Sequence, residues 1–100
     1  MSRVETLTRT ERDVVMTDLV GYVAQVLGAE TVEVLQVGPR SKLFVELGIN
    51  SIDMVRLIEL VDEKYPVGEQ LVRWGADLNV VSLLRVTLAD VADVICHAMG

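Results

Sequence analysis

The sequence predicts an all-α fold, a small bundle of three main helices plus one or two short helices. Apolar residues recur at helical spacing in three stretches, over residues 9–27, over 51–65 and from 87 onward. No pair of strands is evident beside them. The chain has 100 residues, 51% of them hydrophobic, which is enough for one core in one domain.

The first main helix is expected over residues 9–27, after a flexible N-terminus at residues 1–8, and residues 9–98 are expected to form the folded domain. Acidic residues occupy its first turn, where the helix dipole favours them. Gly28 is suited to end it. Its apolar face consists of Val15, Leu19, Val23, Val26 and Leu27.

A long loop over residues 28–50 is expected to join the first two main helices, with turns at Gly28, Gly38, Pro39 and Gly48. Val32, Val34 and Leu35 are compatible with a short strand, although no partner strand is evident. A loop of this length in a small domain is usually functional or tightly anchored. The expected anchors are Val37, Leu43, Phe44 and Leu47.

The second main helix is expected from Ser51 to Tyr65, ending before Pro66. Its core face should hold Met54, Leu57, Ile58, Val61 and Tyr65. Its other face should expose Ile52, Val55, Arg56, Glu59, Asp62 and Glu63.

Glycines and a proline break the segment over residues 66–86, where short helices are expected at 69–74 and 80–84. Thr87 and Asp90 have the spacing of a capping box, with Asp in place of the usual Glu or Gln. The last main helix should follow this box. Its apolar stripe consists of Leu88, Val91, Ile95 and Ala98.

The composition excludes several classes of protein. The net charge is −6, from 15 acidic and 9 basic residues, which argues against a nucleic-acid binder. The single cysteine excludes an internal disulfide. No signal peptide and no run long enough to span a membrane is visible, so we expect a cytoplasmic protein that does not bind membranes.

No catalytic apparatus is discernible, so we expect a protein that is not an enzyme. Cys96 and His97 are adjacent on one predicted helix and point about 100° apart, which prevents a nucleophile–base pair. No cluster offers the three or four ligands of a metal site, and no phosphate-binding glycine loop is present. Cys96 is interpreted as a small packing residue and His97 as a solvated cation at a helix end.

One segment does carry a specific pattern, and it reads LFVELGINSIDMVRL over residues 43–57. This segment resembles the modification site of the acyl carrier and peptidyl carrier family. The resemblance continues through residues 59–65 and, more weakly, 87–95, and in all it covers 9–98. It implies an acyl-carrier-like bundle of the discrete, stand-alone type, and we expect a monomer.

The resemblance also implies a function. Ser51 would be covalently joined to a 4'-phosphopantetheine arm, taken from coenzyme A. Acyl or aminoacyl intermediates would be bound to that arm as thioesters. The implied partners are a phosphopantetheinyl transferase, an acyl- or aminoacyl-loading enzyme, and a downstream transferase or synthase. The implied setting is a dedicated biosynthetic pathway, such as a polyketide or nonribosomal peptide pathway. The motif is closer to the acyl type, but the choice between acyl and aminoacyl cargo stays open.

The physical chemistry of the segment agrees with modification at Ser51. Gly48 allows a sharp turn before the helix, and the N–H groups and dipole of a helix N-terminus favour a phosphodiester. No base stands beside Ser51 in the sequence, so it is a poor nucleophile alone but a suitable substrate for a transferase. The alternative is that Ser51 or Asn50 is only a helix N-cap.

Two residues depart from the family pattern. Asn50 stands where Asp is usual and loses the charge while keeping the hydrogen-bonding shape. Arg56 stands where carriers of primary fatty-acid synthesis usually have Glu, which should disfavour partners with basic patches. Alternatively, Arg56 only pairs with Glu59 or Asp53.

The expected partner surface comprises Asn50, Ile52, Val55, Arg56 and Glu59. An unmodified helical protein–protein interaction module that uses this face is the alternative function. Trp74 either covers the edge of the core or touches the cargo, and core packing is the expectation.

Overall fold

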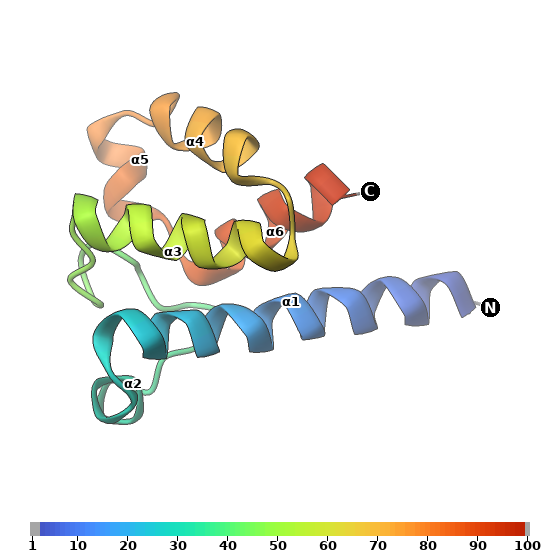
Figure 1. Cartoon of the computed structure of the whole chain (residues 1–100), viewed down its shortest axis with the longest axis horizontal. Coiled ribbons are helices and arrows are strands. Elements are labelled where there is room, and N and C mark those ends of the chain that lie inside the picture. The colour runs from blue at the N-terminus through green and yellow to red at the C-terminus, as the bar shows by residue number, and fades with distance from the viewer. Residues whose placement is uncertain (1–2, 100) are drawn as a thin grey trace.

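The computed structural model describes the backbone of residues 3–99 and the side chains of residues 11–99. Within that range the chain forms six helices and no strand, which confirms the all-α prediction (Figure 1). They are α1 (Arg3–Leu27), α2 (Ala29–Leu35), α3 (Ser51–Lys64), α4 (Gly68–Ala76), α5 (Val80–Arg85) and α6 (Leu88–Met99).

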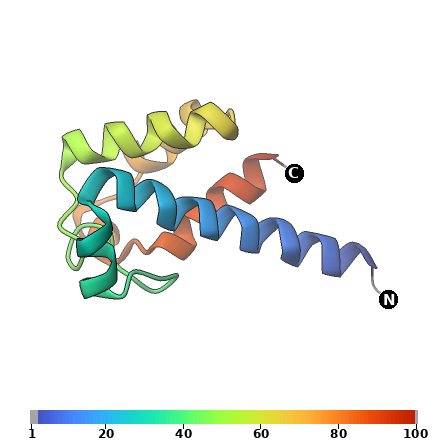
Figure 2. The same ribbon diagram turned by 60° about the horizontal axis from the view of Figure 1, so that its bottom comes forward.

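The three main helices enclose one core. Helix α1 packs against α2, α3 and α6, and α4 packs against α3 and α6. Helix α5 links α4 to α6 at the end of the bundle where α3 begins (Figures 1 and 2). The start of α1 and the end of α6 lie toward the opposite end of the molecule, whose longest extent is 40 Å.

The N-terminal part of the prediction needs correction. Helix α1 begins at Arg3, six residues before the expected start at residue 9. Residues 3–8 contain no glycine or proline, and Arg, Glu and Leu are good helix formers, so nothing in this stretch ends the helix. Residues 1 and 2 of the expected flexible terminus lie outside the described residues.

The strand interpretation of Val32, Val34 and Leu35 is wrong, because residues 29–35 form the short helix α2. A lone exposed strand leaves its backbone groups to water, whereas a helix pairs most of them within the segment. Gly28 ends α1 as expected, and its φ of 98° makes the turn into α2. The bundle therefore has three short helices rather than one or two.

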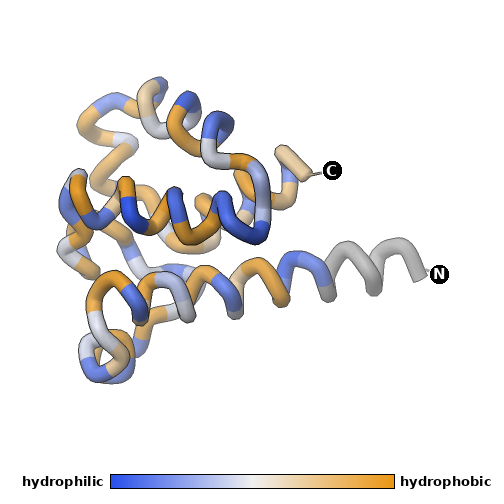
Figure 3. Tube along the Cα trace, viewed as in Figure 1, coloured by the Kyte–Doolittle hydropathy of each residue, from blue (hydrophilic) through white to orange (hydrophobic). Residues whose placement is uncertain are grey.

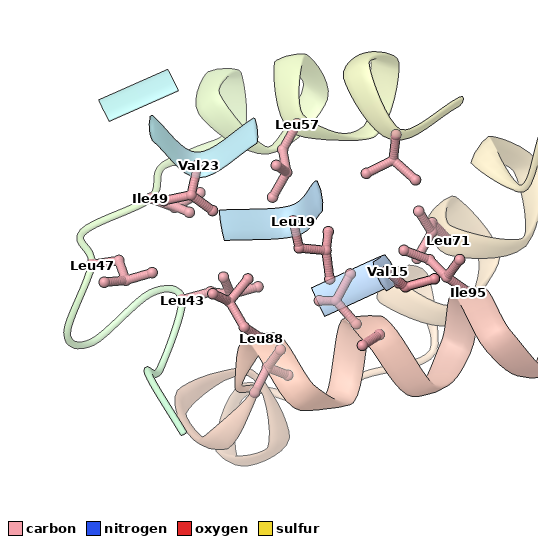
Figure 4. Packing of buried hydrophobic residues seen from close by; sticks show 14 of the residues in the cluster. Val15, Leu19, Val23, Leu43, Leu47, Ile49, Leu57, Leu71, Leu88 and Ile95 are labelled. Atoms are coloured by element: carbon pink, nitrogen blue, oxygen red, sulfur yellow. The ribbon is translucent and has the colours of Figure 1, made fainter. Parts of the chain in front are cut away.

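The core confirms most of the expected packing. Leu19, Val23, Leu43, Leu88 and Ile95 are fully buried, and Figure 4 shows these and neighbouring side chains pointing toward one another from α1, the loop, α3, α4 and α6. On α3, Leu57 and Val61 are buried, while Met54, Ile58 and Tyr65 are partly buried against them. Apolar and polar stretches follow each other along α3 with the turns of the helix, as in an amphipathic helix (Figure 3).

Among residues 3–99, no helix combines the length and the apolar character needed to cross a membrane.

Candidate functional site

The loop before α3 is fixed to the start of α6. The backbone N–H of Leu43 donates to the carbonyl of Val86 at 3.0 Å, and that of Leu88 donates to the carbonyl of Ser41 at 3.1 Å. Leu43, Leu47 and Ile49 are buried in the core. The loop is thus an anchored segment, and it holds the start of α3 at a defined place in the bundle.

A left-handed turn delivers the chain into α3. Gly48 has a φ of 67°, a conformation that costs a side-chain-bearing residue about 1–2 kcal/mol. Ile49 then enters the core, and Asn50 is extended, with φ −96° and ψ −178°. Gly48 therefore has the role that the sequence predicted.

Asn50, and not Ser51, caps α3. The Asp53 backbone N–H donates to Asn50 Oδ1 at 2.8 Å, and the Asn50 backbone N–H donates to Asp53 Oδ2 at 3.3 Å. This pair is a complete capping box. Loss of the charge that an Asp would carry at this position does not disturb the cap, because Asn supplies the same acceptor oxygen.

Ser51 is the first residue of α3, and its side chain is exposed. Within the described part of the chain, its hydroxyl forms no hydrogen bond. The first four N–H groups of a helix have no acceptor within it, and here Asn50 accepts from those of Asp53 and Met54. The N–H groups of Ser51 and Ile52 therefore remain to receive an anionic group.

Neither the histidine nor the cysteine of the chain lies near Ser51. The single histidine, His97, is exposed in the last turn of α6, which lies at the other end of the bundle from the start of α3 (Figures 1 and 2). Among the described residues there is no group of three His, Cys, Asp or Glu side chains placed to hold a metal ion. Cys96 is half-buried, and this burial raises the pKa of its thiol, which favours the less nucleophilic protonated form.

The exposed face of α3 has the composition that the helical spacing predicted. Ile52 is 74% exposed and Val55 is 55% exposed, although both are apolar. Arg56 and Glu59 are also exposed. Arg56 forms no ion pair with Asp53 or Glu59 in the described part of the chain, and Asp53 is engaged in the capping box. The structure thus gives no support to the interpretation that Arg56 only pairs with a neighbour.

An apolar cavity of about 420 Å³ opens beside Ser51, between α3, α4, α5 and the loop. Asn50 and Ser51 are the polar side chains that line it. The apolar lining comes from all four segments and consists of Leu43, Phe44, Ile49, Met54, Val55, Ile58, Leu71, Val72, Trp74, Leu78, Leu83 and Val86. The sequence did not predict this cavity, because nearly half of its lining lies in the segment 66–86. The two short helices of that segment were expected, but no local pattern indicates how they pack against α3.

Trp74 is half-buried and packs against the core, as expected, but it also lines this cavity. The two interpretations of Trp74 are therefore compatible. A side chain in this position supports the fold and is available to any group that enters the cavity.

The far end of α3 is tied to α1. Tyr65 donates its hydroxyl to Asp18 Oδ2 at 2.5 Å, and Lys64 donates to the same oxygen at 2.8 Å. Both hydrogen bonds lower the pKa of Asp18, and the bond from Lys64 has the larger effect. Burial, with the bond to Asp18, raises the pKa of Tyr65 to about 12. The C-terminal end of α3 is thus bonded to α1 through side chains, while the side chain of Ser51 at its N-terminal end faces solvent.

Comparison with known proteins gives one match. The family model described as the phosphopantetheine attachment site matches residues 17–95. No curated protein and no solved structure matches the chain. Domains of this family carry a covalently attached 4'-phosphopantetheine, and in general they interact with a phosphopantetheinyl transferase and with biosynthetic enzymes.

Proposed function

This chain belongs to the phosphopantetheine attachment-site family, and we propose that it carries acyl intermediates as thioesters on an arm attached to Ser51. The observation that carries this proposal is the division of roles at the start of α3. Asn50 and Asp53 complete the cap, so the fold makes no demand on the Ser51 hydroxyl, which stays exposed and free for modification.

The surroundings of Ser51 fit the proposed group. A phosphodiester on the Ser51 oxygen would lie at the positive end of a 14-residue helix, beside the N–H groups of Ser51 and Ile52. When attached, the arm supplies a terminal thiol that holds the cargo. The chain itself then only has to present, shelter and release that cargo, and we infer that it is not an enzyme.

The loading step needs a separate transferase. The Ser51 hydroxyl oxygen attacks the phosphorus of coenzyme A that bears the pantetheine, and a new P–O bond forms there. The P–O bond of the pyrophosphate breaks, and adenosine 3',5'-bisphosphate leaves with the bonding pair. The Ser51 proton passes to a base of the transferase, because in the described part of the chain the nearby Asp53 carboxylate is held in the capping box and the single histidine lies at the other end of the bundle.

The cavity supports acyl rather than aminoacyl cargo. A charged α-amino group would lose its hydration in an apolar cavity without a partner, whereas an alkyl chain gains about 0.8 kcal/mol for each buried CH₂. The lining beyond Asn50 and Ser51 is apolar. The cavity volume of about 420 Å³ falls within the range of about 300–1,000 Å³ that is usual for ligand pockets.

The exposed face of α3 supports a dedicated set of partners. Ile52 and Val55 offer an apolar contact beside the modified residue, and Arg56 adds a positive charge to a chain whose net charge is −6. A partner that fits this face would present an apolar depression and an acidic group opposite Arg56. We therefore propose a specialised biosynthetic pathway, such as a polyketide or nonribosomal peptide pathway, for this carrier.

The test is the intact mass of the protein after incubation with coenzyme A, magnesium and a broad-specificity phosphopantetheinyl transferase. We expect a gain of one phosphopantetheine, lost completely in Ser51→Ala. Ser82→Ala is a matched control, because Ser82 also lies in the first turn of a helix that an Asn caps, and it should be modified like the parent protein. No gain with several transferases would refute the proposal and favour an unmodified interaction module.

A further inference from the structure

Trp74 lies where three hollows of the surface meet. The first is the apolar cavity beside Ser51. The second and third lie over α6, where Asp93 and Val94 border both of them. Of all residues that line these hollows, Trp74 alone is common to the three. Leu78 and Val86 also border the cavity and one of these hollows, so Trp74 together with them separates the cavity from the surface of α6.

The two sides of this indole differ in chemistry. On the side of Ser51 the cavity is bordered by aliphatic residues of α3, α4 and α5. On the side of α6, one hollow has Arg85, Asp90 and Asp93 at its edge, whereas the other is mainly apolar and is bordered by Val94 and Ala98. An alkyl chain gains free energy in the cavity, and over α6 it gains free energy only where it passes the indole into the apolar hollow.

We propose that Trp74 is the end wall of the cavity and determines the longest acyl group that this carrier shelters. The inference rests on the proposed function, since the occupant is the acyl group held on the arm at Ser51. Chains that end before the indole are sheltered by the cavity along their whole length. Each carbon beyond that point either stays in water or requires Trp74 to leave its place against the core, where it is half-buried.

The experiment uses a series of straight-chain acyl groups of increasing length. Each is transferred with its arm from the acyl-coenzyme A to Ser51 by a broad-specificity transferase, and intact mass confirms loading. Trp74 is the only tryptophan of the chain, so its fluorescence reports contact with the acyl end directly. We expect the emission to change when the chain reaches the indole, and the Tm to rise with length up to that chain and then to level off.

Variants of Trp74 test whether its side chain ends the cavity. Trp74→Ala joins the cavity to the hollows over α6, so the plateau in Tm should move to longer chains by at least one step of the series. Trp74→Phe keeps an aromatic ring in the core and should move it less. Tyr22→Ala is the control, because Tyr22 of α1 is a half-buried aromatic side chain that lines neither the cavity nor the hollows over α6, and it should leave the plateau in place.

The outcomes separate this inference from the carrier proposal. Failure of Ser51 to load refutes the carrier proposal and the inference with it. Normal loading with a Tm and an emission that do not depend on acyl length refutes the inference alone. A plateau at the same length in the parent protein and in both Trp74 variants also refutes it. If Trp74→Ala does not fold, Trp74→Phe and the fluorescence of the parent protein decide.

Discussion

Helices α3 and α6 begin with the same device in two different settings. Asn50 and Asp53 form the capping box of α3, and Thr87 and Asp90 form that of α6, at distances of 3.0 and 3.3 Å in the latter. The first residue after the cap is exposed Ser51 in one helix and fully buried Leu88 in the other. The cap fixes where a helix starts, while the surroundings decide whether its first residue packs or stays accessible to a reagent.

The largest expected difference in stability is between variants that truncate the first residue of α6 and the first residue of α3. Leu88→Ala removes a fully buried side chain and should lower the free energy of unfolding by about 2–5 kcal/mol. Ser51→Ala should change it by less than about 0.5 kcal/mol, because the side chain is exposed and its cap is supplied by Asn50. Urea unfolding followed by circular dichroism measures both. Equal losses in the two variants would contradict the contrast between the helices.

The turn that leads into α3 depends on a glycine. Gly48 has a positive φ before α3, so Gly48→Ala should destabilise the protein by about 1–2 kcal/mol. Gly21→Ala in α1 is the matched control, since a Cβ there meets nothing within 4 Å, and it should stabilise by about 0.5–1 kcal/mol. Thermal unfolding compares the two. A Gly48→Ala variant as stable as the parent protein would show that the loop tolerates another path into α3.

Removal of each cap should have a smaller effect. Asn50→Ala and Thr87→Ala should each cost about 1 kcal/mol. The loss should be greater for Thr87, because its box is partly buried and that of Asn50 is exposed. Asn50→Asp retains the acceptor and should be neutral or slightly stabilising near a helix N-terminus. Urea unfolding of the three variants at one pH measures this order, and a greater loss at Asn50 would overturn it.

The smallest expected effect on stability concerns the C-terminal end of α3, where Asp18 accepts hydrogen bonds from Lys64 and Tyr65. The pKa of Asp18 is lowered from 3.8 by these hydrogen bonds, so its contribution is present above about pH 4 and is lost as the pH falls further. Asp18→Asn imitates the protonated carboxyl. It should be less stable than the parent protein by up to about 1 kcal/mol near pH 7, and the difference should shrink as the pH falls from 4 through the lowered pKa of Asp18. A difference that is constant with pH would show that the charge of Asp18 is irrelevant.

Local patterns were sufficient to predict the main helices. The spacing of Leu57 and Val61, with Pro66 beyond them, predicted α3, and the pair Thr87 and Asp90 marked the start of α6. Helix α2 was missed because its seven residues are too short for a periodic signal and include β-branched residues. The extension of α1 to Arg3 was missed because acidic residues in the first turn fit a start near residue 9 equally well.

The candidate site could be predicted only in its local part. The motif around Ser51 and the exposure of Ile52 and Val55 follow from short-range pattern. The cavity does not, because residues such as Leu71 and Leu83 come to line it only through the packing of α4 and α5. The same holds for the bond between Lys64 and Asp18, which are 46 residues apart. Contacts of this kind depend on the tertiary arrangement, which no local pattern encodes.

The placement of the start of α1 and the end of α6 at the opposite end of the bundle from the start of α3 has a practical consequence. A tag, a fused domain or a solid support joined to either end would keep its distance from Ser51. Immobilised protein should then accept the transferase as readily as protein in solution. A fluorophore on such a tag would sense an enzyme docked over Ser51 by energy transfer without obstructing the site.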